Sequence, residues 1–208
     1  GVICQTEVCR MDVLEARLHA LGLYPDRRKL YRMISGGFRP REAAMDELFG
    51  SQPLYWEQRE KVLERHPIQF RYPQILTPGI TEVTEMLCRA GLQLAVVSNS
   101  STEVVDQALH QCGIRENFRH IFSGWERPDR KPEPALYQQA MTYFGLKAEN
   151  CLVVEDSPVG IRAGKRAGLP VAALRDRDGL IDQSEADVVL LTIRDLLALP
   201  CVRKTMKM

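Results

Sequence analysis

The sequence predicts an α/β fold in which a doubly wound parallel sheet is accompanied by a small helical domain. From about residue 79 onward, short apolar runs alternate with helical patterns, and such alternation is typical of a parallel sheet with helices on both faces. Residues 7–72 are helical in pattern throughout. With 208 residues, of which 45% are hydrophobic, the chain is long enough to build both parts.

The helical part is predicted to contain separate helices over residues 8–21, 27–34, 40–48 and 55–66. Gly22, the pair Gly36-Gly37 and the turn-forming residues 50–53 interrupt the pattern. The change in character falls at residues 77–79. We therefore assign residues 8–76 to a helical domain and residues 1–7 with 77–200 to the sheet domain.

The second part is predicted to form strands at residues 92–97, 120–122, 151–154, 171–174 and 188–191. Each is a short apolar run between turn-forming residues, as buried strands require. Helices are expected over residues 79–90, 103–112, 135–144 and 193–199, with a further helix beginning at Gly160.

Two adjacent carboxylates, Glu155 and Asp156, directly follow the apolar run 151–154. Ligands of open α/β sheets bind at the carboxyl ends of the strands. Mg²⁺ is commonly held by one or two carboxylates together with waters and substrate phosphate oxygens. Taken alone, the pair could equally be a solvated acidic turn, but its place at a strand end favours a magnesium site.

Two further segments carry candidate phosphate-binding groups. Ser98 and Asn99 follow the strand at 92–97 and open a helix, where a hydroxyl and backbone N–H groups form an anion site. Lys131 stands between an arginine and two prolines that stiffen the backbone. Each signal is weak alone, since the first suits an ordinary helix cap and the second a surface charge. Their order along the chain makes a common site the stronger interpretation.

The three segments resemble motifs of the haloacid dehalogenase superfamily, and within it the β-phosphoglucomutase-like phosphatases. They read Val-Val-Ser-Asn-Ser at 96–100, Arg-Lys-Pro-Glu-Pro at 130–134 and Val-Val-Glu-Asp-Ser-Pro from 153. The resemblance implies a Rossmann-like core with a helical cap, and a Mg²⁺-dependent phosphatase acting on a sugar phosphate or similar small ester. It also implies that Ser98, Asn99 and Lys131 bind the phosphoryl group, that Ser98 and Lys131 serve catalysis, and that Asp156 and Glu155 bind the metal.

The first motif of that family, Asp-x-Asp on a first strand, has no counterpart in these 208 residues. Residues 1–7 resemble the family's sequence just after the second Asp. We therefore expect the nucleophile and the acid/base aspartate on a segment of about ten residues upstream, the usual length of one strand with its turn. Without that strand, the sheet should show an unfilled position beside the strands that begin near Leu92 and Leu152.

Substrate choice is expected in the helical domain, where Gly36 permits close backbone approach and Arg39 and Arg41 can bind a sugar hydroxyl or a second phosphate. Solvated loop arginines are the alternative. Departures from the family pattern at Gln5 and Arg10 favour a phosphatase over a β-phosphoglucomutase-type phosphotransferase. A catalytically inactive binding or scaffold protein of the same fold is the other alternative, whereas a carbon dehalogenase needs no metal and is disfavoured.

The composition limits the classes of partner that the protein is expected to bind. A net charge of +1 gives no reason to expect nucleic acid or a membrane surface as a partner. The six cysteines contain no Cys-x-x-Cys pair and several lie in apolar patterns, as in a protein of a reducing compartment. We therefore expect a cytoplasmic enzyme whose partner is a small phosphate ester.

Overall fold

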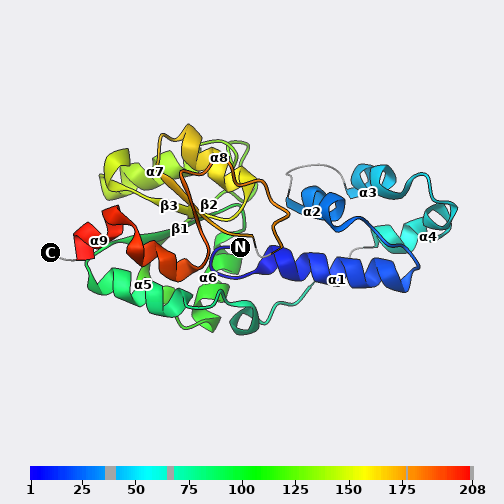
Figure 1. Cartoon of the computed structure of the whole chain (residues 1–208), viewed down its shortest axis with the longest axis horizontal. Coiled ribbons are helices and arrows are strands. Elements are labelled where there is room, and N and C mark those ends of the chain that lie inside the picture. Colours follow the sequence, from blue (N-terminus) through cyan, green and yellow to red (C-terminus); the bar gives the residue numbers. More distant parts are fainter. Residues whose placement is uncertain (36–40, 65–67, 177, 207–208) are drawn as a thin grey trace. The chain divides into compact units, whose positions relative to one another are not determined.

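A computed structural model of the chain describes residues 1–35, 41–64, 68–176 and 178–206. The chain divides into two compact units, a larger one of Gly1–Cys4 with Tyr72–Met208 and a smaller one of Gln5–Arg71 (Figure 1). The interpretation of these units as a catalytic core and a cap stays a prediction. No helix in the described ranges is long and apolar enough to cross a membrane.

The smaller unit consists of helices. They are α1 (Thr6–Ala20), α2 (Arg27–Ser35), α3 (Arg41–Phe49) and α4 (Pro53–Leu63). Pro53 is the first residue of α4. Proline suits this position because N–H groups in the first turn of a helix have no partner within the helix, and proline has no N–H group. Asp46 of α3 accepts hydrogen bonds from Tyr55 Oη at 2.5 Å and from Arg59 Nε at 3.0 Å, both on α4. This polar contact joins α3 to α4 beside the buried rings of Phe49 and Tyr55.

The larger unit is a three-layer α/β arrangement. Its strands are β1 (Leu94–Ser98), β2 (Phe118–Ser123), β3 (Val153–Glu155), β4 (Val171–Leu174) and β5 (Val188–Leu190). Its α-helices are α5 (Ile80–Arg89), α6 (Thr102–Gln111), α7 (Ala135–Phe144), α8 (Pro158–Arg166) and α9 (Pro200–Met206), and its short 3₁₀ helices are η1 (Tyr72–Ile75), η2 (Arg115–Asn117), η3 (Ala148–Asn150) and η4 (Ile193–Ala198). Figure 1 shows α7 and α8 on one side of the strands and α5, α6 and α9 on the other.

Strand β4 shows why both faces of the sheet are covered. Val171 and Ala173 pack with residues of α7 and α8, whereas Ala172 and Leu174 pack with residues of α5 and η4. Successive side chains of a strand point to opposite faces. Because all four β4 residues are buried, the strand needs apolar side chains on both sides, which is why its sequence is a continuous apolar run. The α/β fold class predicted from the sequence is confirmed.

The described strands form two sheets rather than one. In the first, β1 pairs with β2, and in the second the order is β3-β4-β5, with every pairing parallel. Within the described ranges β1 and β3 are not paired with each other. Although most of β1 is apolar, all of its residues are only partly buried. The strand expected upstream, beside the strands that begin near Leu92 and Leu152, stays a prediction.

The C-terminal end of the larger unit differs from the sequence-based prediction. The closing helix expected at residues 193–199 is a 3₁₀ helix, η4, and an α-helix follows it at Pro200–Met206. Thr192 begins η4 with a capping box in which it exchanges hydrogen bonds with Asp195. Val202 of α9 is buried against the core, so the sheet unit extends past residue 200.

Candidate active site

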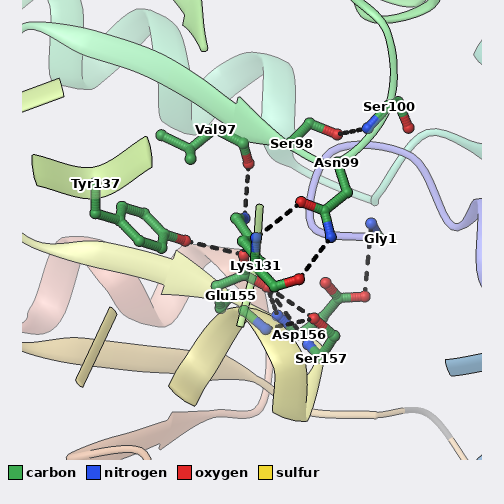
Figure 2. A network of polar contacts seen from close by, with 11 residues as sticks. Gly1, Val97, Ser98, Asn99, Ser100, Lys131, Tyr137, Glu155, Asp156 and Ser157 are labelled. Atoms are coloured by element: carbon green, nitrogen blue, oxygen red, sulfur yellow. Dashed lines mark hydrogen bonds and ion pairs between the residues drawn. The ribbon is translucent and has the colours of Figure 1, made fainter. Parts of the chain in front are cut away.

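The motif residues converge at the carboxyl ends of β1 and β3. Ser98 ends β1, Glu155 ends β3, and Lys131 lies in the loop between β2 and α7. Figure 2 shows the Lys131 side chain directed between the two strand ends, toward Glu155 and the backbone of Val97. Parallel strands bring their carboxyl ends to the same edge of a sheet, so segments far apart in sequence meet here.

A buried ion pair forms the centre of the site. The Lys131 ammonium donates to Glu155 Oε1, and both side chains are less than a tenth exposed. Lys131 Nζ also donates to the carbonyl of Val97 at 2.8 Å. One buried lysine thus connects β1, through Val97, with β3, through Glu155, although the two strands do not pair within the described ranges.

Tyr137 of α7 contacts both members of this ion pair. Its hydroxyl donates to Glu155 Oε1 at 2.9 Å, and Lys131 Nζ lies 5.0 Å from the centre of its ring. Burial raises the pKa of Tyr137 well above its usual value, and the neighbouring Glu155 charge raises it further. The hydroxyl therefore remains a neutral donor. Sequence reasoning did not identify Tyr137, and its position in an apolar helical pattern is the signal of a core residue.

The charge of Glu155 results from two opposing effects. Burial raises the pKa of the carboxyl, but the Lys131 charge and its hydrogen bond, with the Tyr137 hydroxyl, outweigh burial and lower the pKa below the ordinary value. Glu155 Oε2 also accepts from the backbone N–H of Asp156 at 3.2 Å and from Ser157 Oγ at 3.2 Å. Protein donors thus contact both oxygens of this carboxylate.

The start of α8 is shaped around the same carboxylate. Ser157 caps the helix by accepting from the N–H of Gly160 at 3.1 Å. A Cβ placed on Gly160 would lie 2.0 Å from the carboxyl carbon of Glu155. Only glycine fits there, because any other side chain would push the carboxylate away from Lys131.

Asp156 differs from its neighbour. Its side chain is 20% exposed, and one carboxylate oxygen lies 3.6 Å from the backbone nitrogen of Gly1. Its backbone carbonyl accepts a hydrogen bond from the side chain of Gln183 at 2.9 Å. Of the two adjacent acids, Asp156 is the one whose carboxylate is accessible to a ligand.

Ser98 and Asn99 have different roles in the structure. Ser98 Oγ accepts from the N–H of Ser100 at 3.1 Å, so its hydroxyl hydrogen remains available to a ligand. The Asn99 side chain instead holds the lysine loop: its Oδ1 accepts from the N–H of Lys131 and its Nδ2 donates to the Lys131 carbonyl, both at 3.1 Å. Because Lys131 occupies the side-chain amide of Asn99, the prediction that Asn99 binds phosphate can apply only to its backbone N–H group.

The predicted substrate residues are not tested by these contacts. Gly36 and Arg39 lie outside the described residues, and although Arg41 begins α3, its side chain is also outside them. Their role in substrate binding stays a prediction.

The fit of a metal can be judged from the donor set. Within the described part of the chain, no cluster of three or more His, Cys, Asp or Glu side chains could hold a metal ion by itself. Asp156 supplies a partly exposed carboxylate, which is a hard oxygen ligand. Mg²⁺ is usually held by only one or two carboxylates plus substrate phosphate and water, so Asp156 fits as one ligand of such a site.

Comparison with known proteins identifies the family. A family model described as haloacid dehalogenase-like hydrolase matches residues 1–174. The chain belongs to this family. The resemblance inferred from the three motifs is thus confirmed, although the role of each motif residue is not tested by it.

The relatives differ in how much of this chain they match. Phosphoglycolate phosphatase from Aquifex aeolicus is 32% identical over 163 residues, which cover 76% of this chain and 73% of that protein. The CBBY-like protein from Arabidopsis thaliana is 35% identical over 97 residues, which cover 45% of this chain. This match spans only 30% of the plant protein's length.

A solved structure confirms the fold. A conserved haloacid dehalogenase-like protein of unknown function from Agrobacterium tumefaciens superposes with a TM-score of 0.71 at 22% identity. The match covers 100% of this chain and 96% of that one.

The buried pair gives a test of stability. Glu155→Gln should lower the free energy of unfolding by about 3–5 kcal/mol, because it leaves the Lys131 ammonium buried without a counter-charge. Urea unfolding followed by circular dichroism measures the loss. The matched control is Glu82→Gln, which breaks the exposed ion pair with Arg194 and should change stability little. Similar small losses for both variants would contradict the assignment.

Proposed function

We propose that the protein is a Mg²⁺-dependent phosphatase that hydrolyses a small phosphate monoester, such as phosphoglycolate or a sugar phosphate. The observation that carries this proposal is the buried Lys131 ammonium, held between the carboxyl ends of β1, where Ser98 lies, and β3, which Asp156 follows. Membership of a hydrolase family and similarity to a phosphoglycolate phosphatase support it.

Lys131 would bind the transferring phosphoryl group. An ammonium has three N–H donors, and two of them are used by the Val97 carbonyl and by Glu155. The third is left for a phosphoryl oxygen. A phosphate monoester is a dianion, so a cation held in place before the substrate arrives lowers the cost of bringing an anionic nucleophile to phosphorus.

Ser98 would contact the same group from β1. With its oxygen accepting from Ser100, the hydroxyl hydrogen can donate to a phosphoryl oxygen. The backbone N–H groups near Asn99 lie just before the N-terminus of α6. The positive end of the helix dipole at that terminus would attract the phosphate anion. Ser98 and Lys131 together would bind the phosphate from the end of β1 and from the loop between β2 and α7.

The two adjacent acids, Asp156 and Glu155, would have different roles. Asp156 would bind the magnesium ion, and when bound the ion would supply positive charge for the phosphoryl oxygens. Glu155 is already contacted by protein donors on both oxygens, so we assign it to holding Lys131. Its additional role as a metal ligand stays a prediction from the sequence.

The chemical step follows from the family resemblance. An aspartate outside these 208 residues would attack phosphorus and become a phosphoaspartate as the ester P–O bond breaks, and a second aspartate there would protonate the leaving alcohol. The second aspartate would then activate a water that releases inorganic phosphate. Lys131 and Ser98 would contact the same phosphoryl oxygens in both displacements. Gly36, Arg39 and Arg41 are proposed to contact the part of the substrate that lies beyond the phosphate.

Metal dependence tests the proposal. The full-length protein should hydrolyse p-nitrophenyl phosphate or phosphoglycolate with Mg²⁺ and lose that activity in EDTA. Asp156→Asn should lose activity by at least about 100-fold, with little change in melting temperature, because this accessible carboxylate binds a charge instead of packing the core. Undiminished turnover in EDTA, or a fully active Asp156→Asn variant, would refute the proposal.

Lys131 and the arginines of the smaller unit should behave differently. Lys131→Met should lower kcat/KM by at least about 100-fold for every substrate, as loss of a charge-stabilising donor typically does. Arg39→Ala and Arg41→Ala should mainly change which phosphate esters are preferred. A panel of phosphate esters measures this, with Lys147→Met as an exposed control and circular dichroism as the check of folding. Equal proportional losses on all substrates for the arginine variants would remove the specificity role.

A further inference from the structure

Gln183 is a buried amide in the loop between β4 and β5. Its side-chain Nε2 donates to the carbonyl of Asp156 at 2.9 Å and to the carbonyl of Leu174 at 2.7 Å. Its Oε1 accepts from the N–H of Asp176 at 3.3 Å. The residue is only 9% exposed. All three contacts are to backbone groups, so this side chain acts as a bridge between chain segments.

The bridged segments meet at the proposed metal site. Asp156 directly follows β3, and Leu174 is the last residue of β4, the strand paired with β3. The amide of Gln183 therefore ties the end of β4 to the first residue beyond β3. An amide NH₂ group has two N–H donors, and both are used here on carbonyl oxygens. Glutamate at this position, with no such donors when ionised, could not make these contacts.

The loop that carries Gln183 is itself ordered by hydrogen bonds. Asp176, which is 8% exposed, accepts from the backbone N–H of Leu180 at 2.5 Å and of Ile181 at 3.3 Å. Gly179 turns the chain with a φ of +63°, a conformation that favours glycine. The N–H of Ala186 bonds back to the Gln183 carbonyl. These bonds fix the loop from which the Gln183 amide reaches the Asp156 carbonyl.

We propose that Gln183 is a positioning residue that orients Asp156 for metal binding. This inference rests on the proposed function. The Asp156 carboxylate lies against Gly1, and the direction in which it leaves the chain is set by its peptide backbone. Glu155 fixes the N–H side of that backbone and Gln183 fixes the carbonyl side. Groups that orient a metal ligand commonly change metal affinity by about 10- to 100-fold when they are removed.

Metal binding measured without turnover tests this inference. Mn²⁺ binding to the full-length protein is followed by electron paramagnetic resonance, at a temperature where every variant is folded. Gln183→Glu should weaken Mn²⁺ binding by about 10- to 100-fold, because it replaces two donors with an oxygen that repels both carbonyls. Gln183→Met, similar in size and uncharged, should weaken it as well. The matched control is Gln111→Glu, an exposed residue at the end of α6, which should bind as the wild type does.

The outcomes separate the inference from the proposed function. Wild-type affinity in both Gln183 variants, with Mg²⁺-dependent hydrolysis intact, would overturn the inference alone. A lower melting temperature with unchanged Mn²⁺ affinity would show that Gln183 only stabilises the loop, and would overturn it too. A wild-type protein that neither binds Mn²⁺ nor hydrolyses a phosphate ester would overturn both. Weaker Mn²⁺ binding, with activity restored at saturating Mg²⁺, is the result we expect.

Discussion

The site depends on one buried ion pair, between Lys131 and Glu155. Removing two charges from water costs several kcal/mol for each ion, so such a pair persists only when further hydrogen bonds offset the loss. Here the Val97 carbonyl, the Tyr137 hydroxyl and Ser157 supply them. The pair also joins β1 to β3, which are not hydrogen-bonded to each other in the described ranges. The lysine thus contributes to the fold and to the proposed chemistry at once.

The local sequence around this pair follows from the space it needs. Gly160 leaves room for the Glu155 carboxylate. The Asn99 side chain hydrogen-bonds both the backbone N–H and the carbonyl of Lys131. Adjacent residues at the end of a strand point in opposite directions, which is how Glu155 turns inward to Lys131 while Asp156 remains accessible. One short segment can therefore hold a buried counter-ion and a partly exposed carboxylate. The backbone carbonyl of Asp156 in turn accepts a hydrogen bond from Gln183.

The sequence predicted the parts of this arrangement that depend on local patterns. Short apolar runs identified the strands, and the order of Ser98, Lys131 and Glu155 along the chain, with the family resemblance, predicted a common site. Partners set by tertiary packing could not be predicted. A tyrosine in an apolar helix gives no sign that it contacts a buried acid, as Tyr137 contacts Glu155. A glutamine in a polar loop gives no sign that it links the end of β4 to the residue after β3, as Gln183 does. Both adjacent acids were predicted as metal ligands, with Asp156 first, and their burial and hydrogen-bond partners distinguish them in the structure.

A double-mutant cycle between Lys131 and Glu155 tests the central claim most directly. The free energies of unfolding of Lys131→Met, Glu155→Gln and the double variant are measured by urea unfolding, together with kcat/KM of the full-length protein. Each single variant should lose about 3–5 kcal/mol, because it leaves a polar or charged partner buried without its counterpart, and the double variant should recover much of that loss. Its activity should stay as low as that of Lys131→Met. Additive losses in stability, or an active double variant, would contradict the claim that this pair holds the site together.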